Sequence, residues 1–381
     1  MAVIRRLAGQ AARIAAVVKA DGYGHGLEGA ARAFLAGGAG LLCVATLDEA
    51  IVLRAAGIEA PILILYPIPP EAAPAAASAH VELVAAEAGS LAATLDAWRA
   101  WPGARMSEAS LRLHLEIETG LARAGFRPTS AGAAAATIAA TPGAQLVGLW
   151  SHLASSHDPD ASARQLEHFQ AAEASILAAG IELPLRHLAA TGALLAGTGP
   201  SLEMVRPGLA LYGEIPDGFP VDPARAAIVA ELRPAMTLKA RPIRLEWLDA
   251  GETVGYGGRW TAARRSLLAT LPIGYGDGWS RAYGGASWAL VRGRRVPLVG
   301  SVAMDAVMAD VTALPQVTSD DEFVLLGAQG GERITATELA RARTTISWEV
   351  LASMACRVTR VYHAAAGLSG IRTLAGESLT R

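Results

Sequence analysis

The first 210 or so residues alternate short β-rich apolar runs with Ala-rich stretches of helical length. Each run predicts a strand, and most intervals are long enough for a helix that crosses back between two parallel strands. Eight parallel βα units predict an α/β fold, a closed (β/α)8 barrel. The eight runs are Arg13–Lys19, Gly40–Ala45, Pro61–Tyr66, Val81–Ala85, Leu111–Glu118, Gln145–Ser151, Leu185–Ala189 and Glu203–Arg206.

The pattern changes after about residue 222, where short alternating or β-branched runs follow one another with few helical intervals. This predicts a predominantly β second domain. The Pro-, Gly- and Asp-rich segment Pro216–Pro223 indicates the boundary, so we assign residues 1–220 to the barrel and residues 221–381 to the β domain. The predicted strands are Met236–Leu248, Ser266–Ile273, Ala289–Val291, Val296–Val299, Val307–Val311, Glu322–Leu326 and, after helices at Thr335–Ala342 and Ile346–Ala355, a last strand at Arg357–His363.

The composition excludes several classes of protein. Of the 381 residues, 52% are apolar and 18% are charged, which is too apolar for a disordered chain and too interrupted for a membrane bundle. The formal net charge of −2 offers no basic surface to nucleic acid or anionic lipid, so a small molecule is the expected partner. Two isolated cysteines, Cys43 and Cys356, indicate a reducing compartment and no zinc site. We expect a cytoplasmic protein without a membrane span.

Lysine is unusually rare in this chain. Only Lys19 and Lys239 occur, so 31 of the 33 basic residues are arginine. Lys19 closes the first predicted strand, at the mouth of an apolar barrel, where the uncharged amine needed for a Schiff base is favoured. A buried lysine paired with a carboxylate explains the position about as well. Lys239 lies in an alternating, strand-like run, for which surface solvation is the simpler interpretation.

The eighth predicted strand leads into a possible anion site. The segment from Arg206 to Gly213 could present the backbone N–H groups of Gly208 and Leu209 to an anion, and Thr191 could add its hydroxyl. Phosphate sites near strands seven and eight recur in this fold. A helix-capping threonine and a turn glycine are equally good interpretations of each residue taken separately.

Tyr275 lies in a glycine-rich turn, Gly274-Tyr-Gly-Asp-Gly278, of the β domain. A tyrosine acts as a base near neutral pH only where nearby positive groups stabilise the phenolate. Arg123, Arg206 and His152 could do so if the barrel mouth faces that turn. Without such neighbours Tyr275 is an ordinary packed aromatic residue.

Taken in order, six motifs resemble the signatures of the pyridoxal-phosphate-dependent alanine racemases, and the resemblance covers nearly the whole chain. The first and fifth are the most specific together, because they place a lysine in the barrel and a tyrosine in the β domain. The motifs are Val18-Lys-Ala-Asp-Gly-Tyr-Gly-His-Gly26, Thr119-Gly-Leu-Ala-Arg-Ala-Gly125, Ser151-His152, Met204-Val-Arg-Pro-Gly-Leu-Ala-Leu-Tyr-Gly213, Gly274-Tyr-Gly-Asp-Gly278 and Ala303-Met-Asp305.

The resemblance implies an isomerase that interconverts L- and D-alanine, for peptidoglycan synthesis or for alanine catabolism. It implies that Lys19 binds pyridoxal 5'-phosphate as an imine and is the base on one face of the substrate Cα, while Tyr275 of a partner subunit serves the other face. A homodimer with shared sites follows. Arg206 would face the pyridine nitrogen, and His152 would bridge Arg206 and Tyr275.

The resemblance also implies the remaining contacts. Arg123 would lie by the cofactor phenolate and the substrate, and Met304 with Asp305 would help to hold the substrate carboxylate. The residues implied to hold the cofactor, mostly through its phosphate, are Tyr23, Thr191, Gly208, Leu209 and Trp348.

Four departures from the family pattern are visible. Glu116 occupies a position where many members carry a carbamylated lysine, and we expect Glu116 to provide that negative charge to Arg123 directly. Trp348 replaces a tyrosine that touches the cofactor phosphate, so cofactor affinity or substrate size preference should differ. Ala190 replaces an asparagine, a minor change. Family members also have a strand before the segment of Lys19, so we expect this chain to lack it or to use another contact there.

Three alternatives stay open. The first is a broader or serine-preferring racemase, motivated by Trp348. The second is a pyridoxal-phosphate decarboxylase, which would place an acidic residue where Arg206 lies. The third is a non-catalytic or impaired cofactor-binding protein, against which the turn at Gly274–Gly278 argues because single-barrel carriers lack a β domain.

Overall fold

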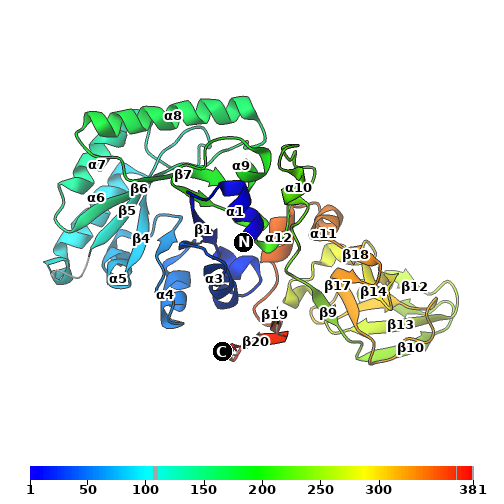
Figure 1. The fold of residues 1–381 in the computed structure, drawn as a ribbon. Helices are drawn as coiled ribbons and strands as arrows, with labels where there is room; N and C mark the ends of the chain where they lie inside the picture. Colours follow the sequence, from blue (N-terminus) through cyan, green and yellow to red (C-terminus); the bar gives the residue numbers. More distant parts are fainter. Residues whose placement is uncertain (106–109, 366, 380–381) are drawn as a thin grey trace. The chain divides into compact units, whose positions relative to one another are not determined.

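Eight parallel strands close into a barrel in the first part of the chain (Figure 1). The computed structural model describes residues 1–105, 110–365 and 367–379. All eight predicted barrel strands are confirmed, with ends that differ by a few residues. They are β1 (Arg13–Val17), β2 (Leu41–Val44), β3 (Ile62–Ile64), β4 (Val81–Ala85), β5 (Leu111–Glu116), β6 (Ala144–Trp150), β7 (Leu185–Ala190) and β8 (Met204–Arg206).

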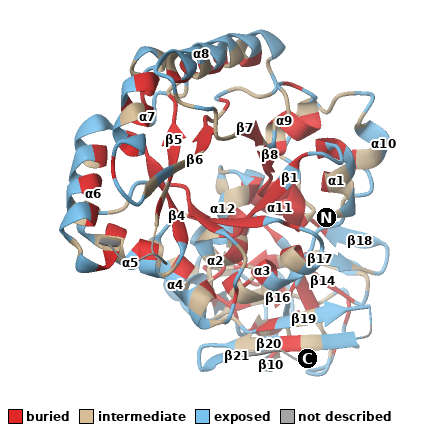
Figure 2. Ribbon diagram, turned by 60° about the vertical axis from the view of Figure 1, so that its left-hand side comes forward, coloured by how far each residue is buried: buried red, intermediate tan, exposed pale blue. Residues whose placement is uncertain are grey.

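The barrel strands are apolar because parallel strands of a closed barrel are covered on both faces. Every residue of β2, β3, β4 and β8 is buried, and Figure 2 shows β4 and β8 in the red of buried residues. Helices cover the outside. They are α1 (Ala2–Ala8), α3 (Leu27–Ala36), α4 (Leu47–Ala55), α5 (Ala73–Ser78), α6 (Ala88–Ala100), α7 (Ala131–Ala139), α8 (Pro159–Ala178), α9 (Thr191–Ala196) and α10 (Ala226–Val229).

The chain divides into two compact units, each made of several separate segments of the sequence. The first comprises residues 1–22, 27–211 and 218–232, and the second comprises residues 23–26, 212–217 and 233–381. The single boundary at residue 220 stays a prediction. Within the described residues, no helix has both the length and the apolar character needed to cross a membrane.

The second unit is mainly antiparallel β structure. Its largest sheet has the order β10-β13-β16-β15-β14-β17-β18, and β9 pairs with β17. Helices α11 (Ala336–Arg343) and α12 (Ser347–Ala352) follow, as predicted. The strands are β9 (Leu238–Ala240), β10 (Arg244–Leu248), β11 (Thr253–Val254), β12 (Trp260–Thr261), β13 (Ser266–Leu271), β14 (Trp288–Val291), β15 (Arg294–Val299), β16 (Val307–Asp310), β17 (Phe323–Gln329), β18 (Glu332–Ile334), β19 (Arg360–Ala364), β20 (Gly367–Thr373) and β21 (Gly376–Leu379).

Two predictions for this unit are wrong in detail. The run Met236–Leu248 is two strands, because Pro242 has no N–H to donate and separates β9 from β10. The predicted last strand is β19, but β20 and β21 extend it into a three-stranded antiparallel sheet. The polar, glycine-containing segments of this extension lack the apolar alternation on which the prediction depended.

Candidate active site

The sequence-predicted barrel residues gather where the strands end. Lys19 follows β1, Arg206 ends β8, and these two strands are paired neighbours. His152 follows β6 and Thr191 follows β7. Since the carboxyl ends of the strands of such a barrel meet at one mouth, these side chains share one end of the first unit. This is the end where enzymes of this fold carry out chemistry.

The chain turns sharply after Lys19. Ala20, Asp21 and Gly22 adopt left-handed backbone angles, which cost about 1 to 2 kcal/mol for each non-glycine residue. Glu49 holds this turn, because its carboxylate accepts from the Ala20 N–H at 2.6 Å and also from the Ala45 N–H at 2.8 Å. The left-handed turn after Lys19 was not foreseen from the sequence, since alanine and aspartate seldom adopt it.

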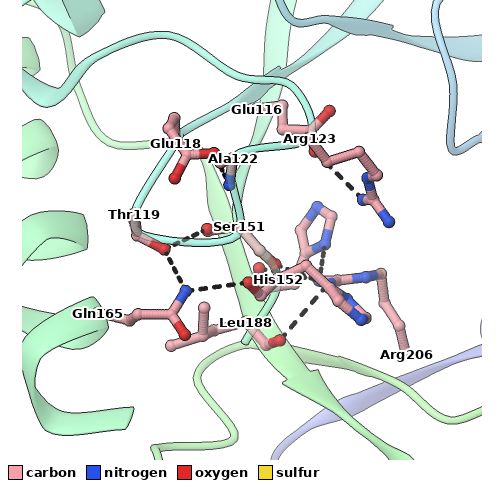
Figure 3. Close-up of polar contacts among 11 residues, drawn as sticks. Glu116, Glu118, Thr119, Ala122, Arg123, Ser151, His152, Gln165, Leu188 and Arg206 are labelled. Carbon is pink, nitrogen blue, oxygen red and sulfur yellow. Dashed lines mark hydrogen bonds and ion pairs between the residues drawn. The ribbon is translucent and has the colours of Figure 1, made fainter. Parts of the chain in front are cut away.

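Arg206 is a deeply enclosed charged group at the barrel mouth, with 3% of its surface exposed. Its Nη1 donates to Nδ1 of His187 at 2.7 Å and to the His187 carbonyl at 2.9 Å. Its Nη2 donates to the Ser151 carbonyl at 2.7 Å (Figure 3). Burial lowers the pKa of Arg206 to about 10, so the guanidinium stays charged at neutral pH. Among the described residues, no hydrogen bond uses its Nε–H.

His152 is held neutral beside Arg206. Burial, followed by the positive charges of Arg206, Arg123 and Lys19, lowers the pKa of His152 to about 3. Its Nδ1 lies 3.4 Å from Nη2 of Arg206 (Figure 3). Because arginine only donates, His152 accepts at Nδ1 and carries its proton on Nε2. The neutral ring therefore has one donor left for another group.

Arg123 forms an ion pair with Glu116, at 3.3 Å between Nη2 and Oε1 (Figure 3). Glu116 ends β5 and is 3% exposed. Burial raises the pKa of the Glu116 carboxyl, while the charges of Arg123 and Arg206 oppose that rise. The guanidinium of Arg123 also lies 5.3 Å from the ring centroid of Tyr66, as does Nζ of Lys19. The predicted charge partner of Arg123 is thus in place.

The loop that carries Arg123 is supported by residues that the sequence did not single out. Glu118 accepts from the N–H groups of Gly120 and Ala122. Gln165 on α8 donates to Oγ1 of Thr119 at 2.9 Å and to the His152 carbonyl at 3.1 Å (Figure 3). Glutamine on a surface helix gives no signal in a single sequence, so this contact had to come from the structure.

Thr191 and the start of the η4 turn (Leu209–Tyr212) supply hydrogen-bond donors at the ends of β7 and β8. Oγ1 of Thr191 accepts from the N–H of Gly208 at 3.0 Å and of Ala210 at 3.4 Å, so the hydroxyl hydrogen is left to donate. The Leu209 N–H begins the turn and has no acceptor inside it. Gly208 thus engages Thr191 in this structure rather than presenting a free N–H.

Within the second unit, Tyr275 lies at the start of the short helix η6 (Tyr275–Asp277) and is 42% exposed. Its N–H donates to the Ala303 carbonyl at 3.0 Å, and the N–H of Gly276 donates to the Met304 carbonyl at 2.9 Å. A Cβ at Gly274 would lie 2.2 Å from the Ala303 oxygen. The glycine pattern around Tyr275 therefore reflects close approach to the segment of Met304 and Asp305.

Arg357 links these two segments by side-chain contacts. Its Nε donates to Oδ1 of Asp277 at 2.7 Å, and its Nη2 donates to Oδ1 of Asp305 at 2.6 Å. Oδ2 of Asp277 accepts from the Gly274 N–H at 2.8 Å. Arg357 was predicted only as the beginning of a strand, and its role here was missed.

Tyr23 and Trp348 also belong to the second unit, as do Tyr275, Met304 and Asp305. The Tyr23 ring stacks on Tyr212 with 5.0 Å between centroids. Trp348 lies in α12 and is partly buried. The predicted site residues thus form two groups, one in each unit.

Comparisons with known proteins address both units. Residues 1–216 match the family model for the alanine racemase N-terminal domain, and residues 235–362 match the model for the alanine racemase C-terminal domain. The chain belongs to the alanine racemase family. It is 39% identical over 355 residues to an alanine racemase of Symbiobacterium thermophilum, covering 93% of this chain and 91% of the relative. It is 40% identical over 356 residues to one of Thermobifida fusca, covering 92% and 91%.

Solved structures agree with this alanine racemase assignment. A crystal structure of alanine racemase from Bacillus anthracis with bound L-Ala-P is similar at a TM-score of 0.88 and 29% identity, covering 97% of this chain and 93% of the other. A structure from E. faecalis is similar at a TM-score of 0.81 and 32% identity, covering 93% and 94%. The barrel followed by a mainly antiparallel β unit is therefore the alanine racemase fold, and the chain is an enzyme of the isomerase class.

Lys239, the other lysine of this alanine racemase family member, is not part of either group. Its Nζ forms an ion pair with Glu322 at 2.8 Å, and half of its side chain is exposed. The surface interpretation of Lys239 fits this contact. Of the two lysines, Lys19 is the one that lies at the end of a barrel strand.

Proposed function

We propose that this enzyme racemises alanine with pyridoxal 5'-phosphate, using Lys19 and Tyr275 as its two bases. The observation that carries the proposal is Arg206, a buried arginine at the end of β8, beside the strand that carries Lys19. An arginine at this place is what the racemase interpretation requires, whereas the decarboxylase alternative requires an acid. Family membership supports the same conclusion.

The donors at the barrel mouth fit this cofactor. An anionic phosphate needs hydrogen-bond donors, and the hydroxyl of Thr191 and the N–H of Leu209 are two of them, at the strand ends where this fold holds phosphates. A pyridine nitrogen accepts one hydrogen bond, and the Nε–H of Arg206 is available to donate it. Tyr23 and Trp348 are further residues that we propose to hold the cofactor, whereas Gly208 acts through its hydrogen bond to Thr191.

When bound, pyridoxal phosphate supplies an electron sink that makes the substrate Cα–H bond acidic. Lys19 then holds or removes a proton on one face of Cα. Tyr275 of a partner subunit does the same on the opposite face, so a homodimer with shared sites is part of the proposal. Removal of the proton on one face and its return on the other inverts the carbon centre.

Arg206 limits what else the site does. Its pKa of about 10 lies well above neutral pH, so Arg206 donates a hydrogen bond without giving up the proton. A pyridine ring whose nitrogen stays unprotonated withdraws electron density less strongly, which disfavours side reactions such as transamination. We propose that His152, with its proton on Nε2, connects Arg206 to the Tyr275 phenol.

Four further residues position the substrate and the cofactor in this proposal. Arg123 lies by the cofactor phenolate, and Glu116 sets its orientation through their ion pair. The Met304 N–H, with Asp305 beside it, helps to hold the substrate carboxylate. We propose that the enzyme is cytoplasmic and that it either supplies D-alanine for peptidoglycan or acts in alanine catabolism.

The test combines cofactor and activity. The purified protein should show a visible absorbance band that borohydride abolishes, and circular dichroism of an L-alanine solution should decay to zero. Lys19→Ala should lose both the band and the decay, whereas Lys239→Ala should retain both. A yellow protein that leaves the optical signal of alanine unchanged would refute the racemase proposal. The same assay with L-serine tests the alternative of a broader or serine-preferring racemase, which Trp348 motivates.

A further inference from the structure

A row of polar side chains crosses the interior of the barrel, behind the residues assigned to the active site. It begins at Arg206 on β8, whose Nη1 lies 2.7 Å from Nδ1 of His187 on β7. Nε2 of His187 lies 2.8 Å from Nδ1 of His114 on β5. Nε2 of His114 lies 2.8 Å from Oε2 of Glu82 on β4. All four residues are buried.

The two ends of this row determine the direction of every bond in it. Arginine only donates, so Nδ1 of His187 accepts and Nε2 of His187 carries the proton. His114 therefore accepts at Nδ1 and donates from Nε2. At the far end of the row, the ionised carboxylate of Glu82 can only accept, and it accepts from Nε2 of His114. Any other arrangement would place two hydrogens, or two lone pairs, against each other in a dry interior.

The charge states agree with this direction. Burial alone would raise the pKa of Glu82, but the hydrogen bond from His114 and the charge of Arg112 oppose burial, and the pKa lies below its usual value. Nε of Arg112 donates to Oε1 of Glu82 at 3.0 Å. Burial, then the charge of Arg206, holds the pKa of His187 well below its usual value. Glu82 is thus ionised, and His187 is neutral.

A glycine makes the row continuous. Strand β6 lies between β5 and β7, and Gly148 of β6 is in register with His114. A Cβ at Gly148 would lie 1.9 Å from Nδ1 of His114, the atom that accepts from His187. No larger residue fits at this position without breaking the row. The absence of a side chain at Gly148 therefore allows His114 and His187 to form their hydrogen bond.

We propose that Glu82 is a positioning residue for the active site, because it ends a one-directional hydrogen-bond row through His114 and His187 that holds the guanidinium of Arg206. Glu82 touches neither substrate nor cofactor. Both terminal nitrogens of Arg206 already donate, Nη1 to His187 and Nη2 to the Ser151 carbonyl. The Nε–H therefore remains as the donor for another group. This role rests on the proposed function, whereas the direction of the row does not.

The direction is tested by nitrogen NMR of the ring nitrogens in protein labelled with ¹⁵N-histidine, with the cofactor bound and after its removal. Both His114 and His187 should show a protonated Nε2 and an unprotonated Nδ1, assigned by loss of each signal in His114→Gln and His187→Gln. A protonated Nδ1 on either ring in the wild-type protein would overturn the proposal. This readout requires neither racemase activity nor a folded Glu82 variant.

The positioning role is tested by a pair of substitutions. Glu82→Leu removes the final acceptor, and we expect kcat for alanine to fall about tenfold through displacement of Arg206. Glu82→Gln keeps an acceptor oxygen and should lose about twofold. Glu173→Leu is the matched control, because Glu173 also pairs with a strand arginine, Arg186 at 3.1 Å, but contacts no histidine of the row. It should racemise like the wild type.

The cofactor spectrum separates positioning from a general loss of structure. In Glu82→Leu the absorbance of the bound cofactor should shift, because the environment of its ring nitrogen changes, and Glu82→Gln should restore the wild-type spectrum. Wild-type kcat and spectrum in Glu82→Leu would refute the role. If the wild-type protein itself fails to racemise alanine while both histidines show the expected protons, the proposed function fails and the direction of the row stands.

Discussion

The barrel mouth and the turn that carries Tyr275 are held in place by different kinds of contact. Arg206 is enclosed, and its position depends on side chains and carbonyls that bond directly to its guanidinium. Tyr275 is 42% exposed, and its turn is held by backbone hydrogen bonds to Ala303 and Met304. The phenol itself is not needed to keep the turn in shape. Substitutions at the barrel mouth should therefore affect folding and catalysis together, whereas those at the turn should affect catalysis alone.

The largest expected effect tests the turn. Tyr275→Phe removes only a hydroxyl, and loss of one general acid-base group should lower racemisation about 1000-fold. The melting temperature should not change, because no described contact depends on that hydroxyl. Optical rotation and thermal unfolding measure the two quantities.

Tyr256→Phe is the control for Tyr275→Phe. Tyr256 lies in the same unit, also begins a three-residue helix and is 78% exposed. Its loss of a hydroxyl should leave both racemisation and melting unchanged. A large drop in melting temperature for Tyr275→Phe would break the distinction between the two regions.

Acid should destabilise the barrel unit through His152. Burial, with the charges of Arg206 and Arg123, lowers the pKa of His152 to about 3, while the unfolded chain takes up this proton near its usual pKa of 6.5. Stability is therefore unaffected above pH 6.5 and falls as the pH drops from there towards 3. At about pH 5 this residue alone should cost about 2 kcal/mol of unfolding free energy.

Urea unfolding at neutral and mildly acidic pH measures this effect. His152→Gln should make the stability of the protein depend less steeply on pH, while His80→Asn, which replaces an exposed histidine, should not. An identical pH dependence in His152→Gln and the wild type would mean that folding does not lower the pKa of His152.

The sequence predicted the barrel well because its signal is local. Each strand is a short apolar run bounded by glycine or polar residues, and Lys19, His152, Thr191 and Arg206 all follow or end such a run. Their convergence then follows from the geometry of a closed parallel barrel. The assignment of the Tyr275 turn depended instead on family resemblance, since a tyrosine in a glycine-rich turn has no distinctive local pattern.

The supporting residues could not be predicted for a physical reason. Glu49, Gln165 and Arg357 act through contacts that join segments far apart in the chain, and their own surroundings in sequence are ordinary helices and loops. Gly148 is similar, because its requirement comes from a histidine on the neighbouring strand. Such residues become visible only when the strands are in register.

A smaller effect is expected at the ion pair of Arg123 and Glu116. Glu116→Gln removes the negative charge but keeps an oxygen, and turnover should fall about tenfold with little loss of cofactor. Because burial raises the pKa of Glu116, the ion pair is lost sooner on acidification than one with an ordinary carboxylate. The wild-type rate should therefore fall at mildly acidic pH in a way that Glu116→Gln does not reproduce.

Glu173→Gln provides the comparison for Glu116→Gln. Glu173 pairs with Arg186 at 3.1 Å, a distance similar to that of the active-site pair, but belongs to no group assigned to catalysis. Turnover and its pH profile should match the wild type. Unchanged activity in Glu116→Gln would show that catalysis does not require the negative charge of Glu116 beside Arg123.

The smallest effect tests whether side chains matter at the turn at all. Arg357→Lys cannot bond Asp277 and Asp305 in the same forked geometry, so the segments of Tyr275 and Met304 should lose part of their alignment. We expect kcat to fall about threefold to fivefold, because the backbone bonds between the segments remain. The matched control is Arg292→Lys, since Arg292 makes a forked contact to Asp321 with almost the same exposure, 38% against 37%. If both variants racemise at the wild-type rate, backbone hydrogen bonds alone hold the turn of Tyr275, in full contrast to the side-chain contacts that hold Arg206 at the barrel mouth.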